Sequence, residues 1–275
     1  MKRLILSLFL MMLGAAISAS AGTDFARRAF QPYLDSGEIP GAITVFHKDG
    51  HEEIACLGFA DVAAQCPMSL DAAFQQCSQT KGFCGVTVAQ LIEDDKVDLD
   101  DPVAKYLPEF KTLWIETENT NGVRRLERTP VPLTLRHCLT HTGGFPFELA
   151  NFTAMGGWSH RMPLRSVAAM AAATPLLFAP GTGVRYSNVG IDVAAAVVEV
   201  VTGRRWEDVV SARILKPLGM DATGFQPTDE QLKTRIEIYR VKKGKRAEHV
   251  PFCPSMPPPF RGDRVFPSAG AGLWT

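Results

Sequence analysis

Runs of apolar residues divide the chain into an N-terminal hairpin and a later series of helices. Residues 42–47 and 54–59 are apolar runs on either side of Asp49-Gly50, a pair typical of a tight β-turn. Residues 24–36 form a predicted first helix, although Pro32 falls inside it. Further helices are predicted over 82–92, 135–139, 164–174, 188–202 and 206–215, and Thr134 is the predicted N-cap of the second of these.

Strands therefore come first and helices follow, which predicts an α+β protein rather than alternating βαβ units. A two-stranded hairpin is too small to be stable alone, so the sheet needs further strands that the pattern does not reveal. The charged residues 111–131 are interpreted as a solvated excursion that turns at Asn121-Gly122. Residues 250–262 are rich in proline and are expected to be irregular.

The first 21 residues have the pattern of a secretory signal peptide. Lys2 and Arg3 precede the apolar run Leu4–Ile17, and Ala19-Ser20-Ala21 provides a small-residue cleavage site. The apolar run is short for a bilayer span and ends in small residues, so it is not expected to be a membrane anchor itself. No stable anchor is expected once the signal is removed. We expect the protein to be exported to the periplasm or the medium, and residues 22–275 to form one domain.

Composition gives no sign of a nucleic-acid partner, and the cysteine spacing gives no sign of a metal or redox site. Lys+Arg and Asp+Glu both number 29 in 275 residues, so no net charge indicates a nucleic-acid partner. Six cysteines lack CxxC spacing, and neither a metal nor a cofactor is predicted. Cys56 and Cys66 bracket a turn and could pair if the protein is exported, whereas most of the others are expected to be small buried side chains.

The first chemical candidate is Ser78 with Lys81. Residues three apart lie on one face of a helix, so the Lys81 amine can reach the Ser78 hydroxyl. A desolvated lysine can act as a base toward a serine nucleophile. The segment through Ile92 is apolar on nearly all sides and predicts a helix buried within the domain. Taken alone, the pair is better explained as a capping serine followed by an exposed lysine.

The second candidate is Tyr186 with Asn188, which follow a loop rich in glycine that begins at Pro180-Gly181. An ammonium group nearby favours the phenolate of a tyrosine, so Tyr186 could take the Ser78 proton and later return it. Asn188 could hold Lys81 or bind a substrate amide. The alternatives are a core tyrosine and an N-cap asparagine.

Six stretches together resemble the serine β-lactamase-related family, which includes class C β-lactamases, penicillin-binding D-Ala carboxypeptidases, D-aminopeptidases and family VIII carboxylesterases. They are Ile39–Gly41, Ser78–Lys81, Leu99–Pro108, Thr134–Gly144, Pro180-Gly181 with Tyr186–Asn188, and Lys216–Met220. The resemblance implies a Ser78 nucleophile, Lys81 and Tyr186 as acid/base groups, Asn188 as a polar positioning residue and no cofactor. It also implies that the Ser78 backbone N–H is half of an oxyanion hole.

The same resemblance implies a β-lactamase/transpeptidase-like fold, with an antiparallel sheet, flanking helices and a helical subdomain. The family's third motif, Lys-Thr-Gly or His-x-Gly, does not follow Tyr186, and the sequence stops at Thr275. We therefore expect the last strands and the C-terminal helix to be missing from this chain. That absence would leave one face of the Ser78 helix uncovered and weaken stability and activity.

The expected activity is acyl-enzyme hydrolysis of a β-lactam, a D-amino-acid peptide or a carboxylic ester. The apolar residues Phe145, Phe147, Phe152 and Trp158 could line an acyl pocket that suits esters, or they could be ordinary packing. The alternatives are a family VIII-type carboxylesterase specifically, or a non-catalytic relic or cell-wall-binding module. The spacing of His137 and His141 also suits a metal site, but no third ligand is visible. An α/β-hydrolase is disfavoured because G-x-S-x-G is absent.

Overall fold

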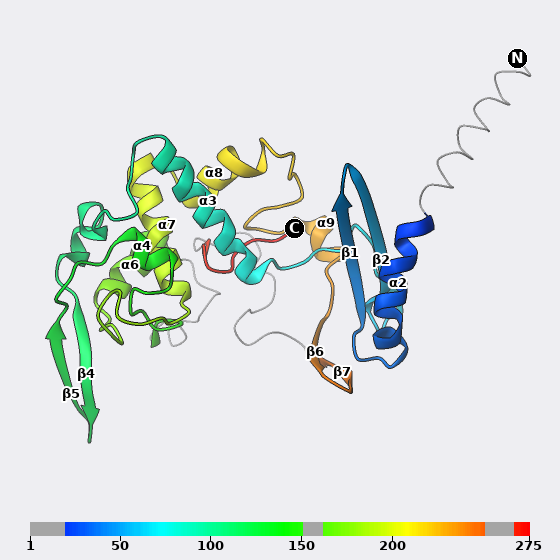
Figure 1. Cartoon of the computed structure of the whole chain (residues 1–275), viewed down its shortest axis with the longest axis horizontal. Coiled ribbons are helices and arrows are strands. Elements are labelled where there is room, and N and C mark those ends of the chain that lie inside the picture. The colour runs from blue at the N-terminus through cyan, green and yellow to red at the C-terminus, as the bar shows by residue number, and fades with distance from the viewer. Residues whose placement is uncertain (1–19, 151–161, 251–266) are drawn as a thin grey trace, which may run out of the picture. The chain divides into compact units, whose positions relative to one another are not determined.

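The computed structural model describes residues 20–150, 162–250 and 267–275. Within these ranges the chain forms two compact units (Figure 1). One contains the residues before Phe74 together with the segment that begins at Asp229, and the other contains Phe74–Thr228 together with the C-terminal residues. The named strands all pair antiparallel and are interspersed with helices along the chain, which confirms the predicted α+β class.

The first unit is built around an antiparallel hairpin and the helix beside it. Strand β1 (Gly41–Lys48) pairs with β2 (His51–Asp61) in a continuous register from Gly41↔Gly58 to Lys48↔His51. The Asp49-Gly50 turn has φ values of 52° and 79°, which suit a two-residue turn with both residues left-handed. The predicted hairpin is therefore confirmed. Helix α2 (Ser20–Asp35) lies along it (Figure 1) and contains Pro32 near its end.

Four shorter elements belong to this unit, and the sequence pattern did not reveal them as strands or helix. They are β3 (Cys66–Pro67), α9 (Asp229–Lys233), and the antiparallel pair β6 (Ile238–Lys242) and β7 (Lys245–Val250). Only β3 joins the sheet of β1 and β2, in the order β1-β2-β3. Cys56 and Cys66 are free thiols here, so the pairing considered for them is not formed.

The second unit is organised around helix α7 (Asn188–Thr202). Every residue from Asn188 to Val198 is buried, because other helices pack around it. These are α3 (Thr80–Glu93), α4 (Leu135–Leu139), α6 (Leu164–Ala172) and α8 (Trp206–Val210), the last followed by a π-helical turn, Ser211–Leu215. The predicted helix bounds agree closely, and Gly203 ends α7 in the left-handed conformation with φ 65°.

Helix α3 differs from its prediction. Cys84, Val88 and Leu91 face the core, but Val86 is 49% exposed on the opposite side. Helices α7 and α8 cover only one face of α3, so the prediction that it is buried on nearly all sides is wrong.

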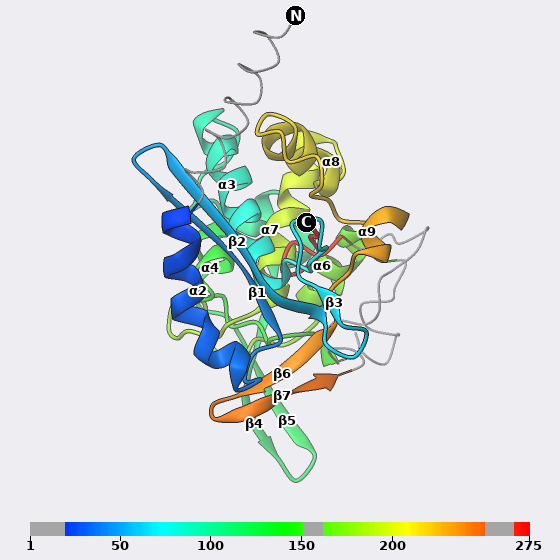
Figure 2. The same cartoon turned by 90° about the vertical axis from the view of Figure 1, so that its right-hand side faces the viewer.

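The charged segment after the short 3₁₀ helices Val103–Lys105 and Pro108–Lys111 forms a hairpin. Strands β4 (Trp114–Thr120) and β5 (Val123–Arg128) pair across the predicted Asn121-Gly122 turn. Both strands are mostly exposed, and the hairpin extends away from the helices of its unit (Figure 2). A solvated segment was predicted correctly, whereas its strands were not, because their charged residues give no apolar alternation.

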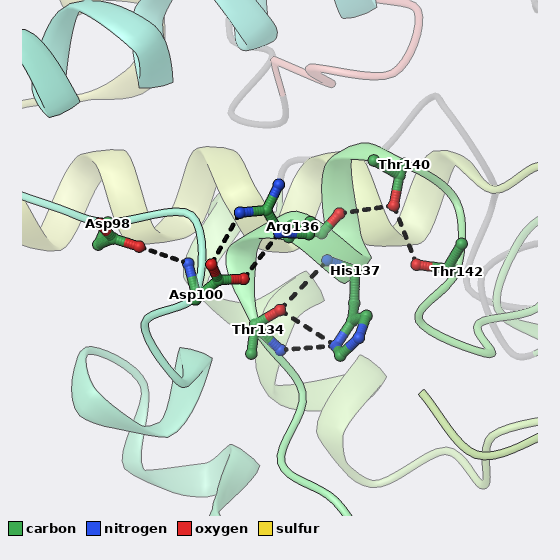
Figure 3. A network of polar contacts seen from close by, with 7 residues as sticks. All are labelled: Asp98, Asp100, Thr134, Arg136, His137, Thr140 and Thr142. Carbon is green, nitrogen blue, oxygen red and sulfur yellow. Dashed lines mark hydrogen bonds and ion pairs between the residues drawn. The ribbon is translucent and has the colours of Figure 1, made fainter. Parts of the chain in front are cut away.

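A polar network ties two of the family-like stretches together (Figure 3). Arg136 donates to both carboxylate oxygens of Asp100 at 2.7 Å. Thr134 caps α4: its side chain accepts from the His137 backbone, and the His137 ring contacts the Thr134 backbone N–H at 3.2 Å. The predicted cap is confirmed, and this reciprocal arrangement fixes the start of the segment that leads to His141.

The predicted signal peptide and the proline-rich segment 250–262 lie almost wholly outside the described residues. Among the helices that are described, none has the length and apolar character needed to cross a bilayer.

Candidate active site

Ser78 lies in a 3₁₀ turn, Cys77–Gln79, immediately before α3. Cys77 has φ 49°, a left-handed conformation that is uncommon for a residue other than glycine. The chain therefore turns sharply just before Ser78, and the Ser78 side chain is exposed at the start of the helix. Such local strain is found preferentially at functional positions.

Lys81 lies one helical turn after Ser78 and contacts three acceptors. Its Nζ atom is 3.2 Å from Ser78 Oγ, 2.7 Å from Asn188 Oδ1 and 2.7 Å from the carbonyl oxygen of Gly270. A lysine ammonium carries three N–H donors, and these three oxygens match them. In this arrangement Lys81 is a fixed cation beside the serine hydroxyl.

Tyr186 lies over this cation. Lys81 Nζ is 4.7 Å from the centre of its ring. Burial raises the pKa of Tyr186, but the contacts with Lys81 and Ser78 and the charge of Lys81 outweigh it, so the pKa lies below its ordinary value of 10.0. The phenol is thus shifted toward the ionised form that can accept a proton from Ser78.

The loop that carries Tyr186 is fastened to the segment after α4. The backbone N–H of Arg185 donates to the His141 carbonyl at 2.9 Å, and that of Ser187 donates to His141 Nδ1 at 3.3 Å. The rings of His141 and Phe147 flank Tyr186, with centroids at 4.6 and 6.1 Å. Burial and the charge of Lys81 lower the pKa of His141, which keeps the ring neutral and able to accept from Ser187.

Asn188 is the first residue of α7 and is 5% exposed. The helix cap is Ser187, whose hydroxyl accepts from the Gly190 backbone at 3.2 Å, so Asn188 is not the cap. Its side chain is instead turned to Lys81. Gly270 packs so closely that an added Cβ atom would lie 2.8 Å from Asn188 Oδ1.

The C-terminal segment runs beside the stretch that leads into Ser78. Gln76 donates from its backbone to the Leu273 carbonyl at 2.8 Å, and Leu273 donates to Thr80 Oγ1 at 3.2 Å. These bonds bring Gly270 to Lys81 from 189 residues further along the chain.

The sequence also matches a known protein family. The family model described as "Beta-lactamase" matches residues 26–275.

The chain belongs to the β-lactamase family.

Relatives in this family carry several names. Esterase EstB of Burkholderia gladioli is 32% identical over 294 residues, which cover 94% of this chain and 69% of EstB. Protein Rv1367c of Mycobacterium tuberculosis (strain ATCC 25618 / H37Rv) is 27% identical over 258 residues, 92% of this chain and 63% of that protein. The chain thus spans a little under two thirds of the Mycobacterium protein that it matches.

Solved structures show the same fold. EstCE1, titled a hydrolase with promiscuous acyltransferase activity, superposes with a TM-score of 0.73 at 26% identity, covering 94% of this chain and 70% of EstCE1. The octameric penicillin-binding protein homologue from Pyrococcus abyssi superposes at 0.64 with 23% identity, over 92% of this chain and 53% of that protein, which shows the fold alone. The predicted β-lactamase/transpeptidase-like fold and the serine hydrolase family are confirmed.

All four predicted site residues of this β-lactamase-family chain come together: Ser78, Lys81, Tyr186 and Asn188. Sequence reasoning missed Gly270, which binds Lys81 through its backbone and offers no side-chain signal. It also missed Asp192, although an acidic residue inside the otherwise apolar stretch Val189–Val198 is a usable signal.

The metal alternative does not fit the structure. Helix α4 ends at Leu139, so His141 is not on the helical face assumed for a pair spaced by four residues. The His137 ring serves the Thr134 cap and the His141 ring packs on Tyr186. Over the described ranges, no three His, Cys, Asp or Glu side chains gather as a metal site.

Two of the four residues predicted to line an apolar acyl pocket are described, and they lie in different environments. Phe145 is 2% exposed and belongs to the core, whereas Phe147 is 41% exposed and lies against Tyr186. Phe152 and Trp158 lie outside the described residues.

Proposed function

We propose that this chain forms an acyl-enzyme on Ser78 and hydrolyses an ester or amide. The observation that carries the proposal is the fixed position of Lys81, held by Ser78, Asn188 and Gly270 beneath the Tyr186 ring. A cation in that position stabilises the Tyr186 phenolate and binds the serine oxygen directly.

In the first step, the Tyr186 phenolate takes the proton of Ser78 as Oγ attacks the substrate carbonyl carbon. The negative charge that develops on the substrate oxygen is stabilised by backbone N–H donors, of which that of Ser78 is one candidate. Tyr186 then returns the proton to the leaving alcohol or amine as the bond to the acyl carbon breaks. A water molecule, deprotonated by the same phenolate, releases the acid from Ser78 and restores the hydroxyl.

The substrate class that we favour is the carboxylic ester. EstB and EstCE1 are named as an esterase and a hydrolase, and the partly exposed Phe147 offers an apolar contact beside Tyr186. β-Lactams and D-amino-acid peptides require the same attack on a carbonyl and are the competing substrates. Residues 1–21 support the proposal that the enzyme acts after export from the cytoplasm, with a small molecule as its substrate.

Intact-mass spectrometry after incubation with a fluorophosphonate probe tests the nucleophile. We expect a mass gain of one probe adduct that maps to Ser78 and is lost in Ser78→Ala. Turnover of p-nitrophenyl butyrate, p-nitrophenyl octanoate and nitrocefin then ranks the substrate classes. A Ser78→Ala protein that retains the adduct or the turnover would overturn the assignment. A folded, unlabelled wild-type chain would instead support a non-catalytic relic that binds cell-wall fragments.

A further inference from the structure

Asp192 is a carboxyl group inside an otherwise apolar part of α7. It lies one turn after Asn188 and is 4% exposed. A carboxyl group in such a position is costly unless hydrogen bonds compensate it, so its partners explain why it is there.

The partners of Asp192 all belong to one turn near the C-terminus. Its Oδ1 atom accepts from Ser268 Oγ at 3.1 Å, from the Ala269 backbone N–H at 2.8 Å and from the Gly270 backbone N–H at 3.2 Å. Ser268 Oγ in turn accepts from the Gly270 backbone at 3.0 Å. The turn is therefore fastened to α7 through a single oxygen atom.

The carbonyl group of Gly270 lies in the proposed active site. Its carbonyl oxygen accepts from Lys81 at 2.7 Å. Asn188 and Asp192 are four residues apart and lie on the same face of α7. Asn188 thus binds Lys81 directly, whereas Asp192 fixes the turn that supplies the second carbonyl-type oxygen.

We propose that Asp192 is a positioning residue, which places Lys81 against Ser78 and Tyr186 by holding the Ser268–Gly270 turn. This inference rests on the proposed function, because it assigns a role to Asp192 in the same acylation site. The role needs an acceptor oxygen at the Oδ1 position and does not need a negative charge there.

The surroundings of Asp192 agree with a role that needs an acceptor oxygen and not a negative charge. Burial raises the pKa of Asp192 to about 7, against the opposing effects of the bonds from Gly270, Ser268 and Ala269 and the charge of Lys81. Among the titratable groups described, Lys81 and Cys84 on α3 face it. Burial, with the Asp192 charge, raises the pKa of the Cys84 thiol, which stays neutral. A carboxyl that is half protonated near pH 7 still offers Oδ1 as an acceptor.

The test follows the titration of Tyr186, which does not require enzymatic activity. In protein labelled with ¹³Cζ-tyrosine, Tyr186→Phe identifies the Tyr186 signal among the four tyrosines. Asp192→Ala removes the acceptor and releases Lys81, so we expect the Tyr186 midpoint to rise by about half a unit or more. Asp192→Asn makes the same change in charge but keeps the oxygen, and should leave the midpoint near that of the unchanged chain.

A matched control separates positioning from loss of stability. Val198 lies on the same helix and is also buried, at 1% exposure. Val198→Ala should lower the free energy of unfolding without moving the Tyr186 midpoint. An unmoved midpoint in Asp192→Ala, or an equal shift in Asp192→Asn, would overturn the proposal. Ser78 labelling, measured in parallel, reports on the proposed function. If Ser78 is not labelled but the Tyr186 midpoint responds as expected, the positioning role of Asp192 stands and the acylation proposal fails.

Discussion

Lys81 Nζ and Asn188 Oδ1 lie 2.7 Å apart although the two residues are separated by 107 positions in the sequence. The contact joins the first turn of α3 to the first turn of α7, the most deeply buried helix described in its unit. The cation of the proposed site is therefore held by an amide that the core keeps in place.

Asn188→Ala removes one of the three acceptors of Lys81 and leaves a donor without its partner. We expect the rate of Ser78 labelling by a fluorophosphonate to fall about 10- to 100-fold, because the loss of one hydrogen bond to a charged group is worth about 1.5–3 kcal/mol. Pseudo-first-order labelling rates from intact-mass time courses measure this. Val198→Ala serves as a control for helix α7, and labelling of Asn188→Ala at the unchanged rate would contradict the assigned role.

Tyr186→Phe tests the general base. Since the pKa of Tyr186 lies below 10.0, the labelling rate of the unchanged chain should increase with pH and level off above a midpoint that is lower than 10.0. In Tyr186→Phe the rate should be lower by about 10²- to 10⁴-fold and this rise should disappear. Phe147→Leu, which alters a ring beside Tyr186 and not the phenol, should keep the rise. A Tyr186→Phe protein with the original pH profile would identify another base.

Asp192 makes stability depend on pH in a specific direction. Its pKa in the folded chain is about 7, above the ordinary 3.8, so the fold favours the protonated carboxyl. The stability that the protonated Asp192 carboxyl gives the fold is fully present below about pH 4 and is lost as the pH rises through 7. The loss is up to about 4 kcal/mol, at about 1.4 kcal/mol per pKa unit.

Asp192→Asn cannot ionise and keeps an acceptor oxygen. Its free energy of unfolding should therefore increase relative to that of the unchanged chain as the pH is raised from 4 to 8. Urea unfolding of both proteins at each pH measures this difference. A difference between the two proteins that stays constant over this range would show that the folded-state pKa of Asp192 is not raised.

The cap of α4 has a measurable role in stability. Thr134→Ala removes the oxygen that accepts from the His137 backbone, and we expect it to lower the free energy of unfolding by about 1 kcal/mol. Arg136→Ala breaks the neighbouring ion pair with Asp100 (Figure 3), which is half exposed, and should cost less than about 1 kcal/mol. Urea unfolding of both proteins gives the comparison, and a larger cost for Arg136→Ala would reverse this ranking.

Much of this arrangement was predictable from local sequence signals. The hairpin around Asp49-Gly50, the Thr134 cap and the end of α7 at Gly203 each depend on residues within a few positions of one another. The six family-like stretches also identified Ser78, Lys81, Tyr186 and Asn188, because each carries its side-chain chemistry in a recognisable motif.

What could not be predicted depends on contacts between distant segments. The role of Gly270 arises from its backbone carbonyl and from the absence of a side chain, and the role of Asp192 arises from three donors in a turn that lies 76 to 78 residues away. The exposed side of α3 was predicted as buried because an apolar sequence does not show which of its faces has a neighbour.

The burial of α7 has a consequence for local opening of the chain. Amide hydrogens from Val189 to Val198 lie in the core, so they should exchange with solvent only when this helical unit unfolds as a whole. The exposed hairpin β4–β5 should exchange far sooner. Because Asn188 and Asp192 are part of the slow-exchanging helix, their side chains should keep their places in the proposed site through every fluctuation short of that unfolding.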